Sequence, residues 1–147
     1  MKKRIVSAAI MLMIITSAAF AGDVEIANPK VITSFQKEFV KAKDVQWEKT
    51  NGLYRATFRM NDFIMYAVFN EDGSLSGAYR NLVSSQLPIG LQTEIKNQFA
   101  DYWITDLYEF SNNEGAGYYV SIESSGQMIM MKSTNATEWQ IVKKIKK

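Results

Sequence analysis

The sequence of 147 residues contains no cysteine and no histidine. Without cysteine the chain cannot form a disulfide, a thiolate nucleophile, a zinc–thiolate site or a lipid-modified anchor. Without histidine it lacks the usual general base and the commonest transition-metal ligand. These two absences exclude most hydrolase designs. We therefore expect a non-enzymatic protein with no catalytic residue, no metal site and no cofactor.

The sequence also lacks an apolar run long enough to cross a bilayer. Its longest run, from Ile5 to Phe20, falls short of the roughly 20 residues that a membrane-spanning helix needs. The run follows Lys2, Lys3 and Arg4 and ends in an A-x-A site at Ala21, which is the layout of a secretory signal peptide. We predict a signal peptide over residues 1–21, cleavage after Ala21, and a periplasmic or secreted protein without stable membrane insertion.

The predicted leader carries three of the 17 basic residues and none of the 15 acidic ones. The mature chain would thus hold 14 basic and 15 acidic residues, with a net charge near −1. Nucleic-acid binding is not expected of an exported chain with this balance. Lys143, Lys144, Lys146 and Lys147 crowd the C-terminus. This tail could touch anionic lipid, polysaccharide or an acidic protein, although a solvated, frayed terminus is favoured.

Hydrophobic periodicity predicts a helix followed by four strands, twice. Apolar residues at helical spacing indicate a helix over 30–41, with Asn28 as its N-cap. From Val45 to Arg80 the period becomes two, and turn sequences separate four short strands. After Pro88 a second helical pattern appears, and four further strands follow between 104 and 143.

This order predicts an α+β fold of tandem α-β4 repeats, at about 29–81 and 88–143, within one domain over 22–147. The helices would pack on one face of an antiparallel sheet. The two halves could share one eight-stranded sheet or form two packed sheets.

Several short motifs, taken in order, resemble the PepSY-like family of β-lactamase-inhibitor-like periplasmic proteins. They are F-x-x-x-F (Phe35, Phe39), V-x-W (Val45, Trp47), G-x-Y-x-A-x-F (Gly52 to Phe58), F-x-x-D-G (Phe69 to Gly73), L-P (Leu87, Pro88), Y-Y-V (Tyr118 to Val120) and W-x-x-x-K-K (Trp139 to Lys144). The resemblance covers the mature chain. It implies tandem α/β repeats and export, and it brings no catalytic residues.

Strand alternation separates the residues that would face the helices from those on the open sheet face. Arginine and tyrosine, which are enriched at protein interfaces, recur on the open face. The alternative is an ordinary solvated sheet surface. The residues predicted to bind a partner are Arg55, Thr57, Arg59, Tyr66, Arg80 and Tyr119.

Three functions stay open at this point. The leading hypothesis is a binding module that engages, and could inhibit, an envelope or extracellular protein or peptide through the open sheet face. The second is a small-molecule or peptide-binding domain with a site between the repeats. The third is a structural accessory protein of the envelope. An enzyme using Asp101, Asp106 and Glu109 is disfavoured, because a short chain without insertions offers no evident cleft.

Overall fold

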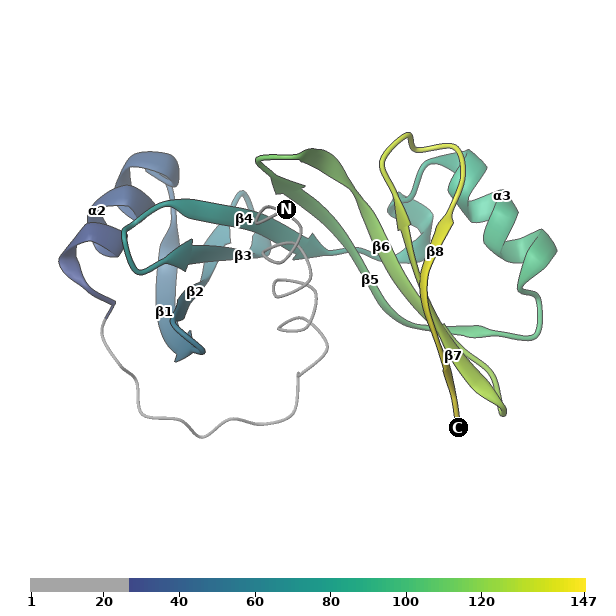
Figure 1. Cartoon of the computed structure of the whole chain (residues 1–147). Coiled ribbons are helices and arrows are strands. Elements are labelled where there is room, and N and C mark those ends of the chain that lie inside the picture. Colours follow the sequence, from purple (N-terminus) through teal and green to yellow (C-terminus); the bar gives the residue numbers. More distant parts are fainter. Residues whose placement is uncertain (1–26) are drawn as a thin grey trace. The chain divides into compact units, whose positions relative to one another are not determined.

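The computed structural model describes residues 27–147 (Figure 1), so the predicted signal peptide lies outside the described residues. The elements are helix α2 (Pro29–Glu38), strands β1 (Lys43–Thr50), β2 (Leu53–Met60), β3 (Phe63–Asn70) and β4 (Leu75–Asn81), the short 3-10 helix η1 (Ser84–Gln86), helix α3 (Ile89–Gln98), and strands β5 (Trp103–Asn112), β6 (Gly115–Glu123), β7 (Gln127–Ser133) and β8 (Gln140–Lys146). The eight strands follow one another in sequence order in a single sheet.

The predicted α+β fold of tandem α-β4 repeats is wrong. Residues 27–147 form mostly one eight-stranded antiparallel sheet, with 53% of these residues in strands and 19% in helices. The physical reason is that each α-helix has only ten residues, whereas every strand pairs with its neighbour in sequence. Within this sheet the chain divides between Ala78 and Tyr79 into two compact units.

Two tight turns set the register of the first three strands. Asn51 and Gly52 have φ values of 50° and 77°, and Asn61 and Asp62 have φ values of 50° and 66°. Positive φ at both central residues is the type I′ geometry that joins strands through two residues. The Asn51–Gly52 turn is therefore of this type, and Thr50 pairs directly with Leu53.

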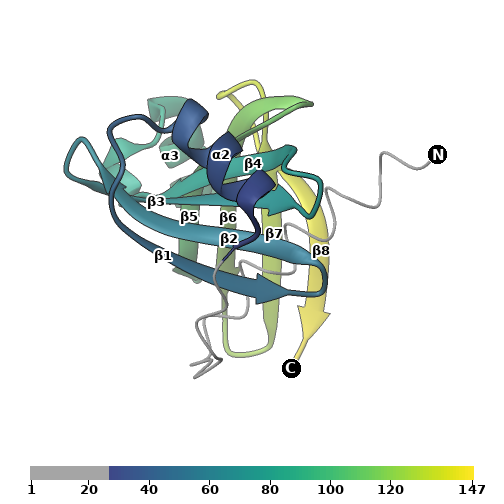
Figure 2. The same cartoon turned by 90° about the vertical axis from the view of Figure 1, so that its left-hand side faces the viewer.

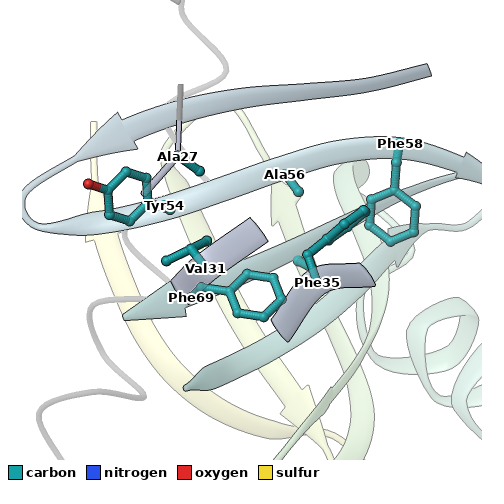
Figure 3. Close-up of a cluster of buried hydrophobic side chains, with 8 residues drawn as sticks. Ala27, Val31, Phe35, Tyr54, Ala56, Phe58 and Phe69 are labelled. Atoms are coloured by element: carbon teal, nitrogen blue, oxygen red, sulfur yellow. The ribbon is translucent and has the colours of Figure 1, made fainter. Parts of the chain in front are cut away.

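The core of the first unit forms between α2 and the strands β2 and β3. Figure 3 shows Val31 and Phe35 of α2 beside the strand residues Tyr54, Ala56, Phe58 and Phe69. The ring of Phe35 lies 5.0 Å from that of Phe58 and 5.2 Å from that of Trp47, both in edge-on geometry. The helix therefore covers one face of these strands, as Figure 2 also shows.

Helix α2 begins as predicted and ends earlier. The Asn28 side chain accepts a hydrogen bond of 3.1 Å from the Val31 N–H, which confirms the N-cap. At the other end Phe39 leaves the helical conformation, with a φ of −123° and a ψ of 59°. Its ring then packs 4.8 Å from that of Phe58, so aromatic packing takes the place of a further helical turn.

The core of the second unit lies beneath α3. Leu91 of α3 is fully buried against residues of β5, β6 and β7. Trp139, in the loop before β8, donates through its indole N–H to the Leu91 carbonyl at 3.1 Å. Its backbone N–H donates to the Glu94 carboxylate at 2.9 Å. Trp139 thus fills this core with its side chain and ties α3 to the β7–β8 loop through its indole and backbone N–H groups.

Gly117 in β6 leads to a stability prediction. A Cβ placed there would lie 2.1 Å from the Ser133 carbonyl oxygen and 3.1 Å from the Phe110 ring. Because a backbone group cannot move aside as a flexible side chain does, we expect Gly117→Ala to lower the free energy of unfolding by about 1–3 kcal/mol in urea denaturation. Gly126→Ala is the matched control, since a Cβ there meets nothing within 4 Å. Equal stability of the two variants would contradict this packing.

Candidate binding surface

The face of β1–β3 turned away from α2 collects polar and charged side chains. On β2 the core residues Tyr54, Ala56 and Phe58 alternate with Arg55, Thr57 and Arg59. The strand register places Gln46 and Glu48 of β1, and Ile64 and Tyr66 of β3, beside Arg55, Thr57 and Arg59. We call this surface the polar face of the first unit, and its polar and exposed residues are Gln46, Glu48, Arg55, Thr57, Arg59, Ile64 and Tyr66. Val68 lies on the same face, directly opposite Arg55, and is fully buried.

Arg55 is held in the middle of the polar face from both sides. Glu48 lies directly opposite it on β1, and the Arg55 Nε donates to Glu48 Oε2 at 3.1 Å. A second contact joins Arg55 Nη2 to the same oxygen. On its other side, the guanidinium carbon of Arg55 lies 5.9 Å from the centre of the ring of Tyr66 on β3, within the range of a cation–π contact. Arg55 thus presents a guanidinium whose orientation is already restricted.

Arg59 and Ile64 form the more accessible end of the polar face. They lie directly opposite each other on β2 and β3. Arg59 is exposed, and 57% of Ile64 is exposed to solvent. Next to them, Thr57 pairs with Tyr66, and both are half-buried. The polar face therefore combines an exposed apolar side chain with arginines on the neighbouring strand.

The structure brings together four of the six predicted site residues. Arg55, Thr57, Arg59 and Tyr66 share the polar face of the first unit, whereas Arg80 and Tyr119 belong to the second unit. Arg80 and Tyr119 also lie in different surroundings.

Arg80 lies on the face of the second unit that carries its core. Its Nε donates to Glu109 Oε2 at 2.7 Å. Glu109 is directly opposite Tyr118, which packs against the α3 core. Strand alternation is therefore misleading here, because it had assigned Arg80 to the same face as Tyr119. Arg80 is half-buried in an ion pair beside the core.

Tyr119 lies on the other face of these strands, in an aromatic cluster. Its ring is 5.5 Å from that of Tyr108 and 4.8 Å from that of Phe110. Lys132 lies over both Phe110 and Tyr119, at 5.0 and 5.6 Å from the ring centres. Tyr119 is only 9% exposed. We conclude that it packs with its neighbours, where alternation alone had predicted an outward side chain.

The environment of Tyr108 disfavours its ionised form. Burial raises the pKa of the Tyr108 hydroxyl above its ordinary value of 10.0, and the neighbouring Tyr119, Asp106 and Tyr79 raise this pKa further. Burial makes the largest contribution to this rise in pKa, because a phenolate loses its hydration in a site of low polarity. Tyr108 therefore stays a neutral phenol at physiological pH.

Glu48 is one of three polar or exposed residues of the polar face, with Gln46 and Ile64, that are not among the six predicted site residues. It accepts the hydrogen bonds that orient Arg55. A signal was present, because Glu48 and Arg55 are equally far from the Asn51–Gly52 turn. In a two-residue hairpin, residues placed symmetrically about the turn pair across the strands.

Within residues 27–147 the structure contains no group of three or more acidic side chains that could hold a metal ion. No helix among these residues is long and apolar enough to cross a membrane.

Comparisons with known proteins identify the fold. No protein-family profile matches the chain, and no curated protein matches its sequence. Among solved structures, the chain is similar to a DUF2874 family protein from Bacteroides ovatus, with a TM-score of 0.72, 18% identity, and coverage of 83% of this chain and 89% of that one. A BLIP-like protein from Bacteroides fragilis has a TM-score of 0.71 and 12% identity, with coverage of 84% and 89%. A protein from Bacteroides eggerthii, provisionally described as periplasmic, has a TM-score of 0.70 and 15% identity, with coverage of 83% and 90%. At these identities the similarity shows a shared fold.

The pair formed by Glu48 and Arg55 can be tested by a double-mutant cycle. Because both side chains are partly exposed, with fractions of 49% and 23%, we expect a coupling free energy of about 0.5 kcal/mol between Glu48→Ala and Arg55→Ala. The coupling should shrink as salt screens the charges. Urea denaturation at low and high ionic strength measures it, and zero coupling at low salt would argue against the contact.

Tyr108 leads to a prediction of pH dependence. Its folded-state pKa is raised, so its contribution to stability is complete below the unfolded pKa of about 10 and is lost as the pH rises beyond it. We expect the free energy of unfolding to fall less steeply above pH 10 in Tyr108→Phe than in the unmodified protein. Tyr66→Phe controls for the loss of a tyrosine hydroxyl. Identical slopes for the unmodified protein and Tyr108→Phe would overturn the prediction.

Proposed function

We propose that this protein is an exported, non-enzymatic binding module that engages a protein or peptide partner through the polar face of the first unit. The observation that carries the proposal is the composition of that face. Arg55 is oriented by Glu48 and Tyr66, and exposed Ile64 lies opposite exposed Arg59. Arginine and tyrosine around an apolar residue are typical of interface centres.

Preorganisation strengthens the argument. A flexible arginine loses side-chain entropy when a partner immobilises it. The Glu48 carboxylate and the Tyr66 ring already restrict Arg55, so part of that loss occurs on folding. A carboxylate or backbone carbonyl of a partner would meet a guanidinium that needs little reorganisation. Inhibition of the partner is one effect that such binding could have.

The remaining predictions belong to the same proposal. The PepSY-like resemblance, the leader over residues 1–21 and the provisional periplasmic description of one structural neighbour support a periplasmic or secreted location. We propose that residues 22–147 form one domain. The name of the BLIP-like neighbour is compatible with a protein partner and a non-enzymatic role. Arg80 and Tyr119 would support the second unit more than contact a partner, because each is engaged by its neighbours.

Site-specific crosslinking tests the surface. We expect a photoreactive amino acid at Ile64, installed in cells that express the protein, to crosslink an envelope or extracellular protein. The same group at Lys37, exposed on α2, serves as the control and should not crosslink it. Crosslinking of the same protein from Lys37 alone would contradict the proposal.

The identified partner then allows a quantitative measurement with purified components. We expect Arg59→Glu to weaken its binding at least about tenfold, since the variant places a like charge where the partner supplies an acceptor. Lys37→Glu changes the net charge equally and should leave the affinity unchanged. Circular dichroism confirms that both variants fold.

A further inference from the structure

The lysine-rich C-terminal segment forms an ordered edge strand. The sequence favours a frayed terminus there, yet Gln140–Lys146 form β8, which is drawn in yellow beside β7 in Figure 1. All seven residues of β8 are exposed. Among the described residues, β7 is the only strand paired with β8, because β8 is last in the strand order. One side of β8 is therefore a sheet edge.

The hydrogen bonding of the last residues shows which backbone groups face outward. The Lys147 N–H donates to the Gly126 carbonyl at 3.1 Å, toward the β7 side. Backbone groups alternate direction along an antiparallel strand. The N–H and C=O groups of Lys144 and Lys146 consequently point away from β7, where another strand could pair with them.

The charged side chains of β8 are all positive. Lys143 and Ile145 lie opposite Met130 and Met128 on one face, while Lys144 and Lys146 project from the other. No acidic residue occurs in β8. Its exposed apolar residues are Ile141, Val142 and Ile145, with 48%, 48% and 39% of their surfaces accessible.

The opposite edge of the sheet differs in both charge and geometry. Strand β1 carries Lys43 and Lys49 together with Asp44 and Glu48, so its charges balance. Its register shifts between Lys43 and Gln46, next to Asp44 with a φ of 54°. In β8 the register relative to β7 shifts at Val142. The pairing of Lys143–Lys146 with β7 is therefore regular, and this stretch of the edge carries three lysines.

The charges of β8 determine which kind of strand could pair with its free edge. A second copy of β8 would bring lysines against lysines, and like charges on paired strands are destabilising. Lysines on edge strands commonly prevent such self-association. An acidic strand would instead place carboxylates beside Lys144 and Lys146. A flat anionic membrane could meet the lysines of only one face, whereas a paired strand meets lysines on both.

We propose that β8 accepts an extended acidic segment of a partner protein as a ninth strand, with backbone pairing along Lys143–Lys146 and alternating acidic and apolar side chains. Strand addition to an exposed edge uses main-chain hydrogen bonds for affinity and side chains for selection. This surface is separate from the polar face of the first unit, so either proposal can fail alone.

The test uses the purified protein and a short, end-capped, fluorescent peptide that alternates Glu and Val. We expect saturable binding by fluorescence anisotropy and slower hydrogen exchange at the Lys144 and Lys146 amides. A peptide of equal charge with a central proline should bind about tenfold more weakly, because proline cannot donate to the ladder. Lys144→Gln with Lys146→Gln should weaken binding about fivefold, through the loss of two cross-strand charge pairs.

Matched controls separate strand addition from general attraction of charge. Lys37→Gln with Lys41→Gln removes two exposed lysines elsewhere and should leave the affinity unchanged. Equal binding of the proline peptide, equal weakening by both lysine pairs, or no binding would each overturn the proposal. A membrane role would also overturn it. In that case the protein binds vesicles of one part phosphatidylglycerol and three parts phosphatidylcholine, the Lys144→Gln, Lys146→Gln variant does not, and the peptide fails to slow hydrogen exchange at the Lys144 and Lys146 amides.

Discussion

The pairing register of the first three strands is the constraint on which the candidate surface depends. Two-residue turns at Asn51–Gly52 and Asn61–Asp62 fix that register. A shift by one residue would exchange the two faces of a strand, burying charge and exposing the partners of Phe35. The same register that assembles the α2 core therefore places Arg55 between Glu48 and Tyr66.

The two units use their second faces differently. In the first unit this face carries the exposed side chains of Arg59 and Ile64. In the second it carries the buried rings of Tyr108 and Tyr119, and their low polarity raises the pKa of Tyr108. Similar strand alternation thus produces a polar surface in one unit and a packed aromatic cluster in the other. For this reason we propose that recognition through a sheet face belongs to the first unit.

The structure gives the C-terminal lysines a role in the architecture that their composition does not reveal. In a free, frayed tail the lysines would have no fixed positions relative to one another. As β8 they lie at defined positions along a sheet edge, opposite residues of β7. The edge and the polar face belong to different units, so the chain offers two candidate surfaces of different chemistry. One presents oriented arginine beside an apolar residue, and the other presents backbone groups flanked by lysine.

Much of the local structure was predictable from the sequence, because its causes are local. Asn28 caps α2, Asn51–Gly52 supply positive φ values, and alternation identifies Arg55, Thr57, Arg59 and Tyr66 as one face. Only the tertiary structure decided three further points. It joined the strands in one mainly β sheet, it placed Arg80 beside Glu109, and it buried Tyr119. The physical reason is that helical spacing and alternation describe a residue relative to its neighbours in sequence, whereas burial and strand partnership depend on residues far along the chain.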